Sequence, residues 1–113
     1  MNIGKLVGNT PLIKINYEYE GRLSSIYTKL EFYNYSGSIK DRIALYIIEK
    51  EKEIGNLVDG QSIIEVTSGN TGIAFSAIGA LFGHEVHIWV DALFKWQFGI
   101  AAYIVALPIS RSV

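Results

Sequence analysis

Two short stretches of the sequence carry residues that could do chemistry, one just before a predicted helix and one in the first turn of another. The first, residues 67–72, reads TSGNTG and combines hydroxyl, amide and glycine residues. A helix N-terminus presents unpaired backbone N–H groups and partial positive charge, and glycine lets a ligand approach the backbone closely. This loop is therefore a candidate cradle for a carboxylate or a phosphate. Taken alone, such a loop is more often a structural strand-to-helix turn, and it lacks the spacing of the known dinucleotide and phosphate-loop motifs.

Lys40 is the second candidate, because it lies in the first turn of a predicted helix. A site that is desolvated and close to the positive end of a helix dipole favours the uncharged amine, which is a nucleophile for a carbonyl or an aldehyde. Helical spacing places Lys40 beside Ala44 and Ile47, so its methylene chain could follow the apolar side of the helix. Position alone still favours an ordinary solvated lysine.

Four short runs predict the strands that would position these two stretches. They lie at residues 12–15, 26–30, 62–66 and 84–90 and are rich in β-branched and aromatic residues. Turn-forming residues separate them, as expected for strands joined by loops and helices.

Helical periodicity predicts two helices between these strands. The first begins at residue 39 with Ser38 as its N-cap and ends before Gly55. The second, at 73–82, is apolar on nearly all sides, with Gly79 as a point of close packing. The order strand, helix, strand, helix, strand predicts an α/β fold in which a parallel sheet carries helices on its faces.

Composition narrows the class of protein further. The length of 113 residues suits one small domain, and the net charge of −1 gives no electrostatic case for binding nucleic acid. There is no cysteine, which excludes disulfides and thiolate metal sites, and no signal-peptide pattern is present. The most apolar run, 98–109, is shorter than the about 20 residues of a membrane-spanning helix. We therefore expect a soluble, cytoplasmic protein without a metal site, a membrane or a nucleic-acid partner.

Three stretches together resemble the cysteine synthase family of pyridoxal-phosphate enzymes, in the family's own order. Residues 7–12 (VGNTPL) are similar to the family's opening IGNTPL. Residues 29–42 (KLEFYNYSGSIKDR) resemble its lysine segment, and residues 65–72 (EVTSGNTG) resemble its asparagine loop. The resemblance covers roughly residues 3–90 and implies the N-terminal region of a fold-type II pyridoxal-phosphate enzyme.

The resemblance implies a role for each candidate residue. Lys40 would form the internal Schiff base with pyridoxal 5′-phosphate and later move the α-proton of the substrate, and Asn70 would hydrogen-bond the ring hydroxyl of the cofactor. The carboxylate of the amino-acid substrate would be held by Thr67, Ser68, Gly69 and Thr71. The family reaction is a β-replacement that makes cysteine from O-acetylserine and sulfide. Related β-replacement enzymes such as cystathionine β-synthase stay open, as does the sulfur donor, and full-length relatives are commonly homodimers.

The sequence departs from the family pattern at two places. Tyr35 stands where proline is usual, which should be tolerated because proline there only stiffens the turn. After Val90 no family pattern remains, so we divide the chain into a cysteine synthase-like region, 1–90, and a divergent apolar tail, 91–113. A change of reading frame would explain this tail, and the alternative is an ordinary amphipathic segment that covers a sheet edge.

Three classes of function follow from these observations. The first is an enzyme of cysteine synthase type, for which we expect weak or no turnover by this chain alone, because the family's phosphate-binding loop is not recognisable in it. The second is a non-catalytic remnant or interaction module that retains the α/β core. The third is a small nucleotide- or anion-binding domain that uses residues 68–72.

Overall fold

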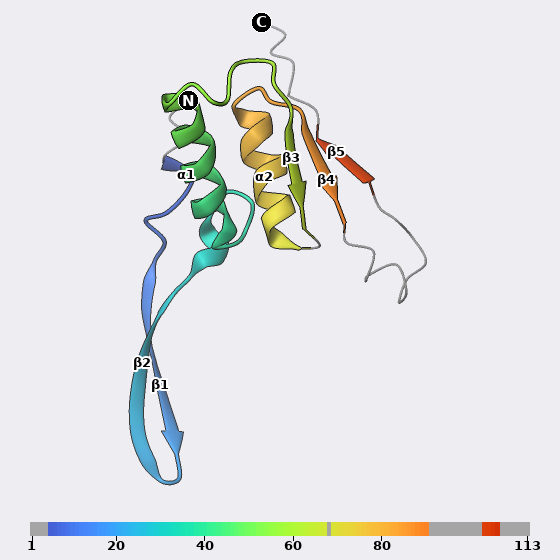
Figure 1. The fold of residues 1–113 in the computed structure, drawn as a ribbon. Coiled ribbons are helices and arrows are strands. Elements are labelled where there is room, and N and C mark those ends of the chain that lie inside the picture. The colour runs from blue at the N-terminus through green and yellow to red at the C-terminus, as the bar shows by residue number, and fades with distance from the viewer. Residues whose placement is uncertain (1–4, 68, 91–102, 107–113) are drawn as a thin grey trace, which may run out of the picture.

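The computed structural model describes residues 5–67 and 69–90, and the backbone of residues 103–106. In chain order its elements are β1 (Leu12–Tyr19), β2 (Arg22–Lys29), a 3-10 turn (Glu31–Tyr33), α1 (Lys40–Glu53), β3 (Ile63–Val66), α2 (Asn70–Leu81), β4 (Val86–Trp89) and β5 (Tyr103–Ala106). Figure 1 shows two parts, a long hairpin of β1 and β2 and a layer of two helices beside a small sheet.

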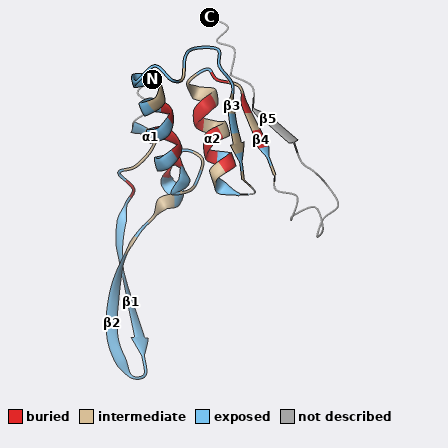
Figure 2. Cartoon of the chain, in the orientation of Figure 1, coloured by how far each residue is buried: buried red, intermediate tan, exposed pale blue. Residues whose placement is uncertain are grey.

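The hairpin pairs β1 with β2 in antiparallel register from Leu12 opposite Lys29 to Tyr19 opposite Arg22. Its two-residue turn, Glu20 and Gly21, has positive φ at both positions (49° and 72°), which is the turn that matches strand twist best. The strands predicted at 12–15 and 26–30 are therefore parts of one hairpin, and the second does not join the parallel sheet. Nearly all of the hairpin is exposed (Figure 2).

The sheet has the order β3-β4-β5. β3 and β4 are parallel, with Ile63 opposite Val86 and Val66 opposite Trp89, and α2 is the crossover between them. The α/β class and the parallel pairing are confirmed. β5 lies within the predicted tail and pairs antiparallel with β4, an arrangement that the edge-covering interpretation of the tail expects.

The core lies where the two helices meet and where α2 meets β4. It contains Ala44, Leu45 and Ile48 from α1, Ala74, Phe75 and Ile78 from α2, and Val86 and Ile88 from β4. Gly79 brings α2 close to the sheet, because a Cβ built there would lie 2.4 Å from Val86 Cγ2. The prediction of close packing at Gly79 is confirmed.

In the described part of the chain, α2 covers only one face of the sheet. A single right-handed crossover places its helix on one side, and α1 packs against α2 rather than on the opposite face (Figure 1). Ile64, Val66 and Trp89 point to the other face and are mostly exposed (66%, 68% and 57%).

The helix boundaries differ from the prediction at the N-terminal ends. α1 begins at Lys40 with Ile39 as its cap residue, so Ser38 is not the N-cap, although its Oγ accepts the N–H of Lys40 at 3.2 Å. The reason is a tight first turn, in which Arg42 N–H bonds to the carbonyl of Ile39. α2 begins at Asn70, three positions before the predicted start, because packing overrides the low helix propensity of this stretch.

Candidate functional site

Lys40 and Asn70 are the first residues of two neighbouring helices that run in the same direction. Figure 1 shows the N-termini of α1 and α2 at the same end of the molecule, where β3 also ends. This end, which we call the site edge, is where α/β proteins place ligands, because helix N-termini and strand carboxyl ends meet there. The two stretches singled out in the sequence therefore lie at one edge.

Two hydrogen bonds of Thr67, the residue that follows β3, hold the loop before α2. Thr67 N–H bonds to the carbonyl of Trp89 at 2.9 Å, and Thr67 Oγ1 accepts the N–H of Gly69 at 3.4 Å. Gly72 allows this arrangement, because a Cβ there would lie 2.8 Å from Thr67 Cγ2. Ser68, which the sequence also places in the carboxylate site, lies outside the described residues.

Among the described residues, the first turn of α2 leaves space for a ligand. Apart from its chain neighbours, none of these residues lies within 4 Å of the position that a Cβ would take at Gly69, and no acidic residue occupies this turn. Gly69 and Asn70 are exposed, and Thr71 is half-buried. Since the first N–H groups of a helix have no intrahelical partner, this turn can bind an anion such as a carboxylate.

Lys40 is exposed in this structure. Ala44 on the same helix is fully buried, but Ile47 is also exposed, so the methylene chain of Lys40 is not enclosed on the apolar side of α1. Lys40 therefore has the exposure of the ordinary solvated lysine that its position alone favours.

A cluster of hydrogen bonds anchors the first turn of α1, and sequence reasoning missed it. The carboxylate of Glu31 accepts bonds from Arg42 Nε (2.8 Å), Arg42 Nη2 (2.9 Å), Thr10 Oγ1 (2.7 Å) and Asn34 Nδ2 (2.8 Å). These bonds, above all the one from Arg42 and then the one from Thr10, lower the pKa of Glu31 from 4.5 to about 2. The same pairing raises the pKa of Arg42. We call Glu31, Arg42, Thr10 and Asn34 the Glu31 cluster.

Asp41 forms a second anchor beside Lys40. Its side chain is fully buried, and it accepts hydrogen bonds from both the backbone N–H and the hydroxyl of Ser36. As an acidic residue in the first turn, Asp41 also favours the positive end of the helix dipole. The structure adds that it ties the loop before α1 to the helix, and an acidic residue near a helix start that follows a serine is the signal that suggests such a tie.

The comparisons with known proteins cover these same elements. A family model described as pyridoxal-phosphate dependent enzyme matches residues 3–95. The chain belongs to this family. A cysteine synthase of Staphylococcus aureus is 42% identical over 84 residues, which are 74% of this chain and 27% of that protein. A cystathionine beta-synthase of Mus musculus is 44% identical over 86 residues, 74% of this chain and 15% of that protein.

A solved structure confirms the fold as well as the sequence resemblance. The crystal structure of a hydrogen sulfide-producing enzyme from Fusobacterium nucleatum matches with a TM-score of 0.74 and 49% identity, over 76% of this chain and 26% of that one. The predicted resemblance to the N-terminal region of a fold-type II enzyme is confirmed. The chain spans about a quarter of the length of the S. aureus relative and of this structure.

The residues at the site edge fit pyridoxal phosphate in their chemistry. An amine such as that of Lys40 can condense with an aldehyde, an amide such as that of Asn70 can hydrogen-bond a ring hydroxyl, and Gly69 carries no side chain that would keep a ligand from the backbone. Among the residues that the structure describes, no cluster of three or more His, Cys, Asp or Glu could hold a metal ion. Within that same part of the chain, no helix has the length and apolar character that crossing a bilayer requires.

Proposed function

We propose that this chain contributes the cofactor-binding lysine and the substrate-carboxylate loop of a pyridoxal-phosphate-dependent β-replacement enzyme of cysteine synthase type. The observation that carries the proposal is the start of two adjacent, parallel helices at Lys40 and Asn70, in a chain that belongs to this family. The proposed reaction makes cysteine from O-acetylserine and sulfide, in line with the relative named cysteine synthase.

Each residue at the site edge has a proposed task. The amine of Lys40 binds the cofactor and then moves the α-proton of the substrate, and the amide of Asn70 orients the cofactor ring. The carboxylate of the substrate is held at the first turn of α2 by Thr67, Ser68, Gly69 and Thr71. When bound, pyridoxal phosphate supplies the electron sink for the α-carbon.

The exposure of Lys40 matters for activity. Because the amine of Lys40 is exposed, water would compete with sulfide for the reacting carbon. We therefore expect weak turnover by this chain by itself. The division at residue 90, a homodimer and a cytoplasmic location stay predictions.

A labelling experiment tests the proposal directly. The chain is incubated with pyridoxal phosphate and reduced with borohydride, and the modified lysines are mapped by mass spectrometry. We expect Lys40 to carry more label than Lys14 of the exposed hairpin, and Lys40→Ala to lose that label while Lys14 keeps its own. Equal labelling of the two lysines in the folded wild-type chain would contradict the proposal.

Three other functions make different predictions, and the first two have specific support. A cystathionine β-synthase type of β-replacement agrees with the mouse relative, and testing an organic thiol against sulfide as the second substrate would separate the two. A non-catalytic module agrees with the exposed Lys40 and with the exposed sheet face of Ile64, Val66 and Trp89. That function predicts a folded chain with no preferential label on Lys40. A small anion-binding domain predicts the same labelling result, together with retained phosphate binding at the first turn of α2.

A further inference from the structure

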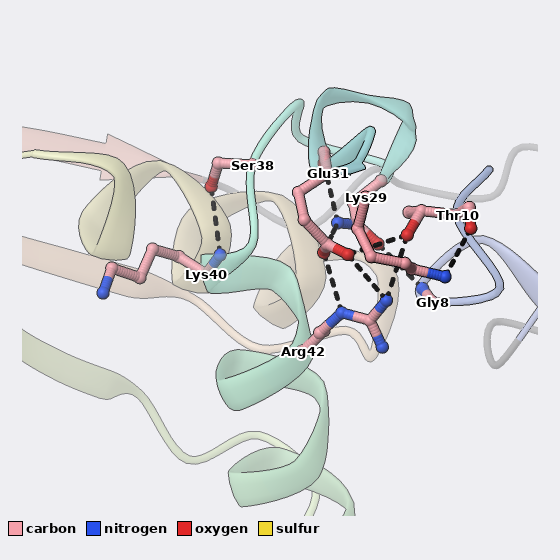
Figure 3. Close-up of polar contacts among 8 residues, drawn as sticks. Gly8, Thr10, Lys29, Glu31, Ser38, Lys40 and Arg42 are labelled. Carbon is pink, nitrogen blue, oxygen red and sulfur yellow. Dashed lines mark hydrogen bonds and ion pairs between the residues drawn. The ribbon is translucent and has the colours of Figure 1, made fainter. Parts of the chain in front are cut away.

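Lys40 and Arg42 leave the first turn of α1 in different directions. Figure 3 shows the side chain of Lys40 extending away from the Glu31 cluster, while the guanidinium of Arg42 lies within it. Arg42 makes two parallel bonds to the carboxylate of Glu31, and its Nη2 also donates to Thr10 Oγ1 at 3.2 Å. Such a bidentate pair fixes orientation as well as distance.

The cluster joins three segments that are distant in the sequence. Gly8 donates its N–H to Asn34 Oδ1 at 2.7 Å, and Thr10 is almost fully buried. Gly8 has φ +84°, and a Cβ at this position would lie 3.2 Å from Arg42 Nη1. Glycine is therefore required both for the backbone conformation and for the approach of the guanidinium. The segment at 8–10, the 3-10 turn and the start of α1 are tied together at one point.

The first turn of α1 is held on its other side by Asp41, through Ser36. Lys40 thus immediately precedes two consecutive residues whose side chains are anchored to separate segments. Exposed ion pairs contribute little to stability in general. Four hydrogen bonds on one partly exposed carboxylate are better explained by a need to fix the orientation of the backbone that carries Lys40.

We propose that the Glu31–Arg42 pair is a positioning device that aims Lys40 at the start of α2. The inference rests on the proposed role of Lys40 and adds to it two residues that do not touch the cofactor. Its physical basis is that a reacting group must be held in a near-attack geometry, and a misplacement of about 1 Å can reduce a rate by on the order of 100-fold.

The test compares variants of the full chain by the ratio of borohydride-fixed pyridoxal phosphate on Lys40 to that on Lys14. Glu31→Gln and Arg42→Gln remove the pair. Glu53→Gln is the matched control, because it breaks the exposed bond of Lys50 to Glu53 at the other end of the same helix. We expect the ratio to fall about tenfold in the first two variants and to stay unchanged in the control. All labelling is done well below the melting midpoint of each variant, so that a purely structural role would leave the ratio unaltered.

The outcomes separate this inference from the proposed function. If wild-type Lys40 is labelled preferentially and both variants keep the wild-type ratio while folded, the positioning role is wrong and the proposed function stands. If wild-type Lys40 shows no preference over Lys14, both are wrong. Should either glutamine variant not fold, Arg42→Lys decides, because it keeps the charge but not the two-bond fork. The labelling ratio of Arg42→Lys is expected to lie below that of the wild type and the control, and above that of a variant that has lost the preference for Lys40. A wild-type ratio would overturn the proposal.

Discussion

Glu31 illustrates what a single side chain can do when several donors converge on it. Its carboxylate accepts two bonds from Arg42 and one each from Thr10 and Asn34. All four donors favour the charged form, so the pKa of Glu31 falls to about 2. The free energy of folding is therefore linked to the protonation of this group.

The linkage predicts a pH dependence. Because the folded pKa of Glu31 is lowered from 4.5 to about 2, its stabilising effect is fully present above about pH 4.5 and is lost as the pH falls toward 2. We expect the melting midpoint of the wild-type chain to exceed that of Glu31→Gln at about pH 6, and the difference to shrink toward about pH 2. Thermal melts followed by circular dichroism measure this. In Glu53→Gln, whose parent pair is exposed, the difference from wild type should be small throughout, and a constant gap for Glu31→Gln would contradict the prediction.

Among single residues, the sequence singled out Lys40 and Asn70, whose roles stay predictions, and it did not indicate the pairing of Glu31 with Arg42. Lys40 and Asn70 stand within recognisable stretches just before or at a helix start. Arg42 is 11 positions from Glu31 and 32 from Thr10, so their contacts depend on how the chain folds back. No local periodicity reports a contact of that kind.

Between elements, α2 approaches β4 closely at its glycines. Gly79 faces Val86, and Gly72 faces Thr67 and Ile88, so both glycines of this helix allow backbone and side chains to meet without an intervening Cβ. Gly79 was predicted as a packing point because an isolated glycine in an apolar helix often has that reason.

Gly79→Ala should destabilise the chain despite the better helix propensity of alanine. The new methyl would lie 2.4 Å from Val86 Cγ2 and 3.3 Å from Ile63 Cδ1, and overpacking costs about 1–3 kcal/mol, while the propensity gain is at most about 1 kcal/mol. Urea denaturation of the single variants and of Gly79→Ala with Val86→Ala measures the effect. Because Val86→Ala vacates the contested space, Gly79→Ala should cost less in that background, and strict additivity would contradict the steric explanation.

Seen as a whole, the described molecule is packed on one side only. The core lies between α1, α2 and one face of the sheet, while the hairpin and the opposite sheet face are exposed (Figure 2). Alternation along β3 decides which residues belong to the core, since neighbouring side chains point to opposite faces. Ile63 packs against the core, and Ile64 does not.

This one-sidedness predicts different costs for two adjacent substitutions. Ile63→Ala removes a side chain that packs on the core and should cost about 2 kcal/mol, at the low end for core truncations because Ile63 is only partly buried. Ile64→Ala should change the free energy of unfolding by about 0.5 kcal/mol or less, as is usual for surface positions. Chemical denaturation of the two variants provides the comparison. Equal costs would mean that both faces of β3 are covered in solution.

The sequence by itself determined the α/β class, the end of the first helix before Gly55, and the presence of two stretches, around Lys40 and Asn70, next to helix starts, because these depend on residue type and on spacing within a few positions. Only the tertiary structure decided that residues 12–29 form a hairpin apart from the sheet and that Glu31 and Arg42 meet. It also decided that Lys40 stands exposed at the start of α1, alongside the start of α2. These features depend on which distant segments pack together, and pairing across such distances leaves no periodic trace in the chain.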